Sequence, residues 1–207
     1  MIFRDRVEAG RKLGEILVSK VRDIDVVVGL PKGGIICASE VAKTLQKPMA
    51  IVLVRRVRHP HSLDYTVGAV ADKDVVVKKC EAAVIDSNWL EEEIDKQKSE
   101  ILRQKNLYLA NRPNVSLKGK SVVIVDDGLD TEVIMLAALE YLKKHDPKEV
   151  HIAVPVTSSA VLSGLDGKIH SKTTLHDDPA FTSIGNYYKT YNEVSDEQIL
   201  NILQNNG

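Results

Sequence analysis

Short runs of β-branched and other apolar residues recur along the chain and predict buried strands. Four of these runs cover residues 25–30, 50–54, 121–125 and 150–156. A continuous apolar run of this length is typical of a strand that is buried on both faces of a parallel sheet. The segments between the runs have helical spacing, so strand and helix alternate along the chain.

Apolar residues three and four positions apart predict two helices between these strands. One helix follows the first strand over residues 35–45, and another follows the third strand over residues 131–144. Such an apolar stripe lets a helix pack against a sheet. The alternation therefore predicts an α/β fold, with a parallel sheet that carries helices on both sides.

Three further elements have local signals. Residues 88–108 read as a longer surface helix, because acids gather at its start and bases follow, which suits the helix dipole. Ser195 and Gln198 form the pattern of a capping box and predict the start of a terminal helix. Residues 67–77 have the pattern of a β-hairpin.

Length and composition bound the class of protein. The 207 residues suffice for one α/β domain with a sizeable core, so we expect a single domain over residues 1–207. Apolar residues make up 43% of the chain and charged residues 28%, which is ordinary for a globular protein. The formal net charge of −1 argues against a general nucleic-acid binder, which usually carries a basic excess.

The sequence also indicates a compartment. No apolar run approaches the roughly 20 residues that a membrane helix needs, and the first ten residues do not resemble a signal peptide. Cys37 and Cys80 are too few and too isolated for a disulfide framework or a zinc site. We therefore expect a cytoplasmic protein without a membrane partner.

A glycine-rich turn follows the first predicted strand. It consists of Leu30, Pro31, Lys32, Gly33 and Gly34, and a predicted helix begins directly after it. Glycines let backbone N–H groups approach a polyanion closely, a helix start offers unpaired donors, and the lysine adds a positive charge. The turn indicates phosphate binding, although a Pro-Gly-Gly sequence also commonly just ends a strand.

Two adjacent acids, Asp126 and Asp127, follow the third predicted strand. Ligands of parallel sheets bind beyond the carboxyl ends of the strands, where these acids would emerge. Neighbouring side chains of an extended chain point to opposite sides, so one acid would face a ligand and the other the protein or a magnesium ion. The alternative is a charged strand end before an ordinary helix start.

Together these turns resemble those of the type I phosphoribosyltransferase family. The similarity includes FRDRVEAGRKL at residues 3–13, GLPKGG at 29–34, VRR at 54–56, VVIVDDGLDT at 122–131 and IGNYYKTYNEVSDEQI at 184–199. The order of these motifs is similar to that of a subgroup of stand-alone bacterial and archaeal proteins. The resemblance spans nearly the whole chain.

The resemblance implies both a fold and a reaction. The fold would be a twisted, mainly parallel sheet flanked by helices, with a small hood at about residues 176–204. The reaction would move ribose 5-phosphate from phosphoribosyl pyrophosphate to a nucleobase-like acceptor and release pyrophosphate, as in nucleotide metabolism. Mg²⁺ would bridge the pyrophosphate and ribose oxygens, and relatives commonly form homodimers.

The resemblance also implies ligands for each motif. Residues 30–34 would bind the pyrophosphate, while Asp126 and Asp127 would hold the ribose hydroxyls and the Mg²⁺ ion. The residues expected to bind the 5′-phosphate are Gly128, Leu129, Thr131, Glu132, Val133 and Ile134.

Three residues are implied as catalytic candidates. Arg55 or Arg56 is similar to the basic residue that reaches the pyrophosphate, and residues 56–67 would form a mobile flap. Asp130 is similar to the aspartate that handles a purine nitrogen proton in relatives that use hypoxanthine or guanine. Cleavage builds positive charge on the sugar and negative charge on pyrophosphate, so the reaction needs donors, a metal and exclusion of water.

The phosphate loop departs from the family pattern at two positions, because Glu132 replaces a glycine and Ile134 replaces a threonine. At about 4 Å and an effective dielectric near 20, like charges repel by roughly 4 kcal/mol, which would weaken a phosphate ligand on the order of 10³-fold. A glutamate in a first helical turn also favours the helix dipole by about 0.3–1 kcal/mol. Our hypothesis is that this loop is capped by its own carboxylate.

Three functions follow from these features. The intact acid pair and glycine turn favour a phosphoribosyltransferase, whereas Glu132 and Ile134 favour a non-catalytic nucleotide-binding or regulatory protein on the same scaffold. An RNA-binding regulator would need a basic face, and Arg55, Arg56 and Arg58 are its only candidates. The acceptor base cannot be read from the sequence, because a fold does not fix the chemistry of its site.

Overall fold

The structure is a computed structural model that describes residues 1–110 and 115–205. The chain forms two compact units. Unit 1 contains the described residues of Met1–Val52, Arg112–Asp130 and His145–Gly207. Unit 2 contains the described residues of Leu53–Asn111 and Thr131–Lys144.

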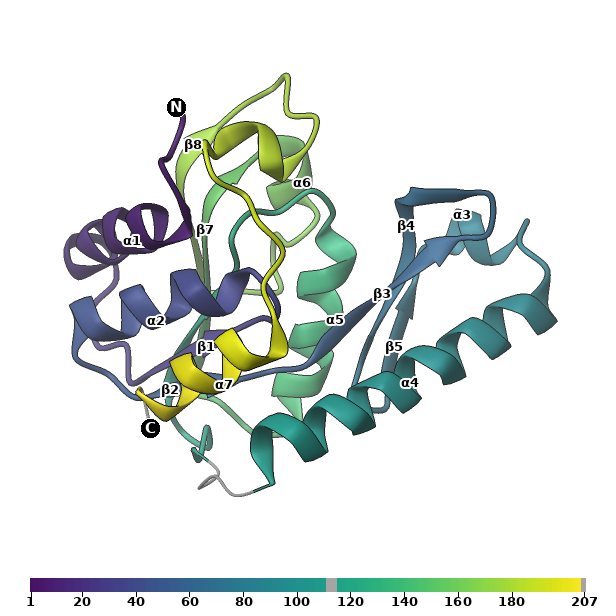
Figure 1. The fold of residues 1–207 in the computed structure, drawn as a ribbon, viewed down its shortest axis with the longest axis horizontal. Coiled ribbons are helices and arrows are strands. Elements are labelled where there is room, and N and C mark those ends of the chain that lie inside the picture. Colours follow the sequence, from purple (N-terminus) through teal and green to yellow (C-terminus); the bar gives the residue numbers. More distant parts are fainter. Residues whose placement is uncertain (111–114, 206–207) are drawn as a thin grey trace. The chain divides into compact units, whose positions relative to one another are not determined.

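A five-stranded parallel sheet forms the centre of unit 1 (Figure 1). Its strands are β1 (Val26–Gly29), β2 (Met49–Ile51), β6 (Ser121–Val125), β7 (Glu149–Thr157) and β8 (Ser171–Asp177). They lie in the order β2-β1-β6-β7-β8, and every neighbouring pair is parallel. All residues of β1 and β6 are buried, which explains their continuous apolar sequence. The parallel sheet and its helices confirm the predicted α/β fold class.

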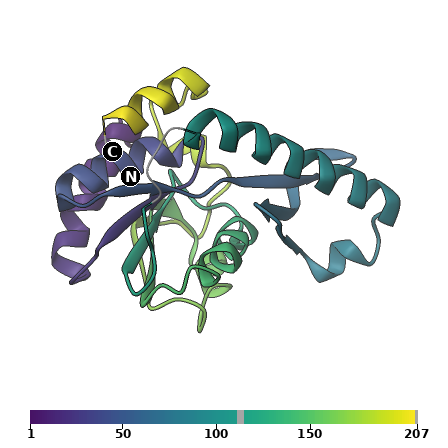
Figure 2. The same cartoon turned by 90° about the horizontal axis from the view of Figure 1, so that it is seen from below.

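Helices α1 (Arg6–Lys20) and α2 (Gly34–Leu45) pack side by side on this sheet (Figures 1 and 2). Glycine permits their close approach, because a Cβ atom on Gly10 would lie only 2.7 Å from the Cα atom of Cys37. The buried face of α1 consists of Arg6, Ala9, Gly10, Leu13, Gly14 and Leu17. An arginine on this apolar face is unusual, because arginines are rarely buried without a partner.

Three short helices complete unit 1. They are α6 (Ser159–Ser163), the 3₁₀ helix η1 (Ile184–Tyr187) and α7 (Asp196–Gln204). The capping box predicted for α7 is confirmed, since the N–H of Gln198 donates to the Ser195 hydroxyl and the Gln198 side chain accepts from the N–H of Ser195. Helix α7 packs against α2.

The strand order changes direction between β1 and β6. From β1 the chain passes through α2 to β2 on one side, and from β6 it continues to β7 on the other. The two strands end at the same level, because Gly29 is paired with Val125 and the N–H of Leu30 donates to the carbonyl of Val125 at 3.1 Å. Open α/β sheets bind their ligands at such a topological switch point.

Unit 2 contains a three-stranded antiparallel sheet in the order β3-β4-β5. Its elements are β3 (Val54–His59), β4 (Ser62–Ala71), β5 (Asp74–Val77), α3 (Lys79–Ala82), α4 (Ser87–Leu109) and α5 (Glu132–Lys143). Helix α5 packs against all three strands, and α4 packs against β3 and β4. The flap expected at residues 56–67 corresponds to the β3–β4 hairpin, and its movement stays a prediction.

The elements predicted from periodicity are largely confirmed. Helices α2, α4 and α5 match the predicted helices, and β4 and β5 form the predicted hairpin. The strand predicted at residues 50–54 is wrong in extent, because β2 ends at Ile51 and β3 begins at Val54. Strand β8 was not predicted, because its sequence, SKTTLHD, has few apolar residues. The single domain over residues 1–207 stays a prediction.

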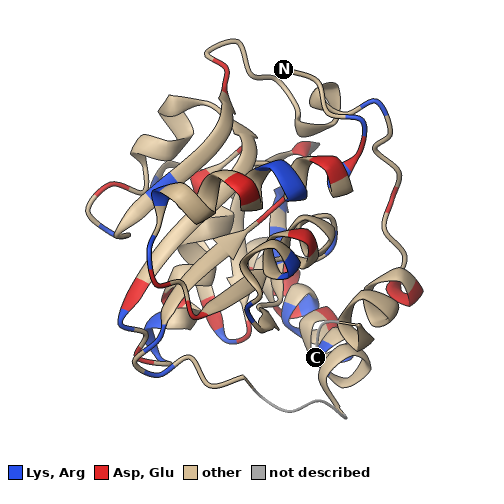
Figure 3. Ribbon diagram, turned by 90° about the vertical axis from the view of Figure 1, so that its left-hand side faces the viewer, with Lys and Arg blue, Asp and Glu red and all other residues tan. Residues whose placement is uncertain are grey.

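Charged residues of both signs are interspersed along the helices (Figure 3). On α4, for example, Lys98 pairs with Asp95 at 3.0 Å and Arg103 pairs with Glu100 at 2.8 Å. Exposed pairs of this kind contribute at most about 1 kcal/mol each. Within the described residues, no helix combines the length and the apolar character needed to cross a membrane.

His151 occupies a buried polar position within the parallel sheet of unit 1. Its Nδ1 atom lies 2.7 Å from the hydroxyl of Ser171, and its Nε2 atom lies 3.2 Å from the hydroxyl of Ser121. Burial lowers the pKa of His151, and His170 lowers it further, whereas the neighbouring carboxylate of Glu149 opposes this shift. The ring is therefore stabilised in its neutral form.

Protonation of His151 is expected to destabilise the fold. Because its pKa in the folded protein lies below the ordinary value of about 6.5, the unfolded chain binds more protons between the two values. The resulting stability is present above about pH 6.5 and is lost as the pH falls through the folded pKa. Urea unfolding measures the free energy of unfolding at each pH. Between about pH 7.5 and 5 this free energy should fall with decreasing pH in the wild type, and it should fall with a smaller slope in His151→Gln. His61→Gln changes an exposed histidine and should keep the wild-type slope. An equal slope in His151→Gln would contradict the assignment.

Candidate active site at the switch point

The glycine-rich turn joins β1 to α2. Leu30 is buried, whereas Pro31, Lys32 and Gly33 are partly exposed, and the Pro31–Lys32 peptide bond is cis. Gly33 is the N-cap of α2 and provides no capping side chain, so the first N–H groups of this 12-residue helix have no side-chain cap. This arrangement suits an anion, which would also interact favourably with the helix dipole.

The acid pair leaves β6 and packs directly on the two glycines of this turn. A Cβ atom on Gly34 would lie 2.7 Å from the Cα atom of Asp126, and a Cβ atom on Gly33 would lie 2.7 Å from the Cγ atom of Asp127. Side chains do not tolerate such distances, so only glycine fits either position. The structure thus brings together the two motifs that the sequence singled out.

Asp126 and Asp127 have different surroundings. Asp126 is partly exposed, and its Oδ1 atom accepts a hydrogen bond of 2.8 Å from the N–H of Asp127. Asp127 is buried, and its Oδ2 atom accepts from Nε of Arg6 at 2.6 Å. The backbone carbonyl of Asp127 also accepts from the Tyr188 hydroxyl at 2.6 Å. The buried acid is therefore held by both its side chain and its backbone.

Arg6 is the most enclosed cation of this site. Its Nη1 atom donates to the carbonyl of Asn192 at 2.8 Å, and its guanidinium lies 3.9 Å from the centroid of the Tyr191 ring. Burial alone would lower the pKa of Arg6, but Asp127 and Tyr191 outweigh it and raise the pKa. Burial, with Asp127 contributing, also raises the pKa of Tyr188 and of Tyr191. Arg6 is therefore charged, and the two tyrosines are neutral.

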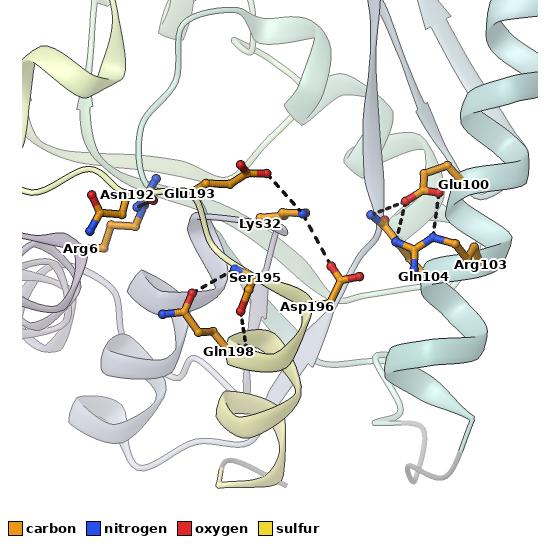
Figure 4. Close-up of polar contacts among 10 residues, drawn as sticks. All are labelled: Arg6, Lys32, Glu100, Arg103, Gln104, Asn192, Glu193, Ser195, Asp196 and Gln198. Carbon is orange, nitrogen blue, oxygen red and sulfur yellow. Dashed lines mark hydrogen bonds and ion pairs between the residues drawn. The ribbon is translucent and has the colours of Figure 1, made fainter.

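Lys32 lies between two acids of the C-terminal segment (Figure 4). Its Nζ atom is 3.8 Å from Oε1 of Glu193 and 3.6 Å from Oδ1 of Asp196. The side chain of Lys32 is 34% exposed and that of Glu193 is 88% exposed, so water screens these pairs. The ammonium group can therefore exchange these partners for a ligand phosphate at small cost.

The loop after the acid pair is anchored to β7. A Cβ atom on Gly128 would lie 2.7 Å from Cγ2 of Ile184, which explains the glycine. The N–H of Leu129 donates to the carbonyl of Val156 at 3.0 Å, and the carbonyl of Leu129 accepts from the Thr157 hydroxyl at 2.8 Å. Asp130 follows as an exposed residue and is the last residue of this segment of unit 1.

The remaining residues of the expected phosphate loop begin α5 in unit 2. Thr131 is the N-cap but makes no capping bond, and its buried Oγ1 atom has no hydrogen-bond partner in the described structure. Glu132 is partly exposed in the first helical turn, and within the described residues its carboxylate accepts no hydrogen bond from the N–H groups of that turn. Val133 and Ile134 are buried, so their side chains are packing residues. Capping by Glu132 stays a prediction.

Arg55 and Arg56 lie on β3 of unit 2. The Nε atom of Arg55 donates to Oε1 of Gln97 at 3.0 Å, and Nη1 of Arg56 donates to the Thr66 hydroxyl at 3.2 Å. Adjacent residues of a regular strand point to opposite faces, so the two arginines cannot share one role. Which of them reaches the pyrophosphate stays a prediction.

The buried cysteine supplies no nucleophile to the site. The thiol of Cys37 is buried under α1, and burial together with Asp127 and Asp126 raises its pKa well above the ordinary value. A thiol in this state is neutral and unreactive. Among the described residues, no group of three or more His, Cys, Asp or Glu side chains forms a metal site.

Sequence reasoning missed the contribution of both ends of the chain. Arg6 stood out only as part of the FRDRVEAGRKL motif, although an arginine in line with Ala9 and Leu13 on an amphipathic helix signals a buried partner. Tyr191 and Asn192 likewise stood out only as part of the motif at residues 184–199. No sequence pattern indicates that these residues contact Arg6.

The chain is similar to known proteins over most of its length. A family model described as "Phosphoribosyl transferase domain" matches residues 4–181. Two proteins of Mycobacterium tuberculosis, from strains CDC 1551 / Oshkosh and ATCC 25618 / H37Rv, carry the name "Putative phosphoribosyl transferase" and are 29% identical over 205 residues. The match covers 98% of this chain and 46% of each relative, so the chain spans about half their length.

A solved structure matches the complete chain. The crystal structure of TT1426 from Thermus thermophilus has a TM-score of 0.82 to this chain and 35% sequence identity. The match covers 100% of this chain and 99% of that chain. The two proteins therefore share one fold over their whole lengths.

The packing of the acids on the glycines predicts the effect of a single methyl group. Gly34→Ala is expected to lower the free energy of unfolding by about 1–3 kcal/mol, because the new Cβ atom meets the backbone of Asp126. Urea unfolding measures this change, and Lys43→Ala on the exposed part of the same helix should stay within about 0.5 kcal/mol of the wild type. An unchanged or higher stability of Gly34→Ala would show that the two turns are not in contact.

Proposed function

The chain belongs to the phosphoribosyl transferase domain family, and from this premise we propose that it transfers ribose 5-phosphate from phosphoribosyl pyrophosphate to a nitrogenous base. Pyrophosphate is the second product. The observation that supports the proposal most strongly is the contact between the acid pair and the glycine turn at the switch point. In this proposal, the carboxylate of Asp126 binds the ribose hydroxyls and the adjacent start of α2 binds the pyrophosphate.

The pyrophosphate end of the substrate fits the turn after β1. The uncapped N–H groups of α2 provide donors, and Lys32 provides a positive charge that is only loosely paired. Arg55 or Arg56 is the further cation that we assign to this leaving group. These groups stabilise the negative charge that develops on pyrophosphate as its bond to the sugar breaks.

The ribose and its phosphate fit the loop after β6. The partly exposed carboxylate of Asp126 is suited to accept hydrogen bonds from the ribose hydroxyls. The start of α5 offers N–H groups without a capping bond from Thr131. The buried hydroxyl of Thr131 has no partner among the described residues, which supports a ligand phosphate at this helix start.

Magnesium fits the site only together with the substrate. The described residues offer no cluster of three metal-binding side chains, but Mg²⁺ is commonly held by one or two carboxylates plus substrate phosphates. Asp126 is the side chain that we assign to it. When bound, Mg²⁺ supplies positive charge that stabilises the leaving pyrophosphate.

The reaction is a substitution at the anomeric carbon of the ribose. The bond from this carbon to a pyrophosphate oxygen breaks, and the electron pair leaves with pyrophosphate. A nitrogen of the base forms the new bond through its lone pair and gives up its proton, for which we propose exposed Asp130 as the acceptor. The β3–β4 hairpin is the element that we propose to exclude water.

A non-catalytic binding or regulatory protein is the second candidate. Glu132 places a carboxylate in the first turn of α5, where a phosphate would bind, and the side chain of Ile134 is buried. The cationic Lys32 is already near two acids. A cytoplasmic homodimer in nucleotide metabolism is compatible with either candidate and is part of the proposal.

Glu132 is expected to weaken the binding of phosphoribosyl pyrophosphate without abolishing it. The side chain is partly exposed, so its repulsion is screened, and Glu132→Gln should tighten binding about tenfold, or about 1.4 kcal/mol. Titration calorimetry with excess Mg²⁺ measures the dissociation constant. Glu140→Gln removes an exposed acid farther along the same helix and should leave this constant unchanged. Equal affinities of Glu132→Gln and the wild type would remove Glu132 from the phosphate site.

Turnover separates the two candidate functions. With Mg²⁺ and phosphoribosyl pyrophosphate, the wild type is expected to release pyrophosphate only when a suitable purine or pyrimidine base is added. Asp126→Asn should lower the rate by about 10²-fold or more at an unchanged unfolding temperature, because it removes an acceptor for the ribose hydroxyls. Tight binding without pyrophosphate release from any base would instead favour the regulatory protein.

A further inference from the structure

The two acids of the site are not equivalent in the structure. Asp127 and Arg6 form an ion pair of 2.6 Å in which the side chains are only 8% and 10% exposed. Asp126 precedes Asp127 in the chain but remains partly exposed. Both residues are aspartates, so their difference in burial and in ion pairing arises from the fold.

Arg6 is fixed on three sides. Its guanidinium binds Asp127, donates to the carbonyl of Asn192 and lies over the ring of Tyr191. The planar guanidinium is suited to such simultaneous hydrogen bonding and stacking, whereas the ammonium group of lysine is not. Helix α1 and the C-terminal segment therefore hold one cation against the second acid from opposite ends of the chain.

The ion pair also contacts the glycine turn. A Cβ atom on Gly33 would lie 2.7 Å from Nε of Arg6 and 2.7 Å from Cγ of Asp127. The turn therefore rests on both members of the pair. A change in either side chain would be transmitted directly to the backbone that precedes α2.

We propose that Arg6 is a positioning residue that withdraws Asp127 from ligand and metal, so that Asp126 alone acts as the ligand-facing acid. This inference rests on the proposed function only in naming a ribose phosphate and Mg²⁺ as the ligands of Asp126. Three observations form the geometric basis. The ion pair is buried, Asp127, Asn192 and Tyr191 contact Arg6 from three sides, and both members of the pair contact Gly33.

The pair has an electrostatic consequence for an anionic substrate. Two adjacent ionised carboxylates would together carry a charge of −2 beside the glycine-rich turn, and the guanidinium of Arg6 offsets the charge of Asp127. Because Coulomb repulsion is strong in a partly buried site, this reduction favours a pyrophosphate ligand. The remaining carboxylate of Asp126 can still accept hydrogen bonds from sugar hydroxyls.

Unfolding temperatures test the pair itself. Asp127→Asn and Arg6→Met each leave one buried partner without its counter-charge, and each should lower the unfolding temperature by about 10 °C. The double variant Arg6→Met/Asp127→Asn leaves no charge at the position of this pair and should have a higher unfolding temperature than Arg6→Met alone. Asp126→Asn serves as the matched control and should unfold close to the wild type.

Binding of Mg²⁺ alone tests the positioning role. Arg6→Met releases Asp127 beside Asp126, and two adjacent carboxylates should bind Mg²⁺ at least about fivefold more tightly than the wild type. Arg6→Lys keeps the charge but loses the simultaneous hydrogen bonding and stacking, so its affinity for Mg²⁺ should lie between those of the wild type and Arg6→Met. A purely structural role of Arg6 would not increase the affinity for a metal ion. If Arg6→Met does not fold, folding of the double variant still supports the buried pair.

The result that would overturn the inference is specific. Asp127→Asn would have the same unfolding temperature as the wild type, and Arg6→Met would bind Mg²⁺ no more tightly than the wild type. Equal losses of affinity for magnesium phosphoribosyl pyrophosphate in Asp127→Asn and Asp126→Asn would also overturn it. Absence of any binding by the wild type would instead refute the proposed function, while the unfolding temperatures would still judge the ion pair.

Discussion

The packing of two acids against two glycines is the constraint on which the site depends. Asp126 and Asp127 end one strand, Gly33 and Gly34 follow its neighbour, and no side chain fits between them. Because β1 and β6 are adjacent and parallel, their carboxyl ends must meet at the switch point of the sheet. The fold thus brings a helix start without a side-chain cap and the partly exposed carboxylate of Asp126 together without a long loop. In the proposed function, the helix start binds pyrophosphate and the carboxylate accepts hydrogen bonds from the ribose hydroxyls.

Charge balance within the protein then assigns different tasks to similar residues. Arg6 neutralises Asp127 in the interior, where an unpaired charge would be costly. Lys32 lies near the largely exposed Glu193 and the partly exposed Asp196, whose attraction water screens, so a ligand phosphate can compete for it. The uncapped start of α2 adds further donors for an anion. The structure therefore separates charges that maintain the fold from charges that can exchange their partners.

The sequence predicted the parts of this site better than their connections. Continuous apolar runs predicted β1, β6 and β7, because strands buried on both faces need apolar residues throughout. The glycine turn and the acid pair were visible because local backbone chemistry selects them. The partner of Asp127 was not, since Arg6 is 121 residues away and no local rule links the two. The same limit applies to Asn192, whose contribution is a backbone carbonyl that any residue could supply.

The most direct measurement of this account is a crystal structure of the protein with Mg²⁺ and phosphoribosyl pyrophosphate bound. We expect the pyrophosphate on the turn after β1, the ribose hydroxyls within hydrogen-bonding distance of Asp126, and an unbroken ion pair between Asp127 and Arg6. A complex in which Asp127 leaves Arg6 and contacts the ribose or the metal would contradict the unequal roles of the two acids. A ligand that binds away from the switch point would contradict the site itself.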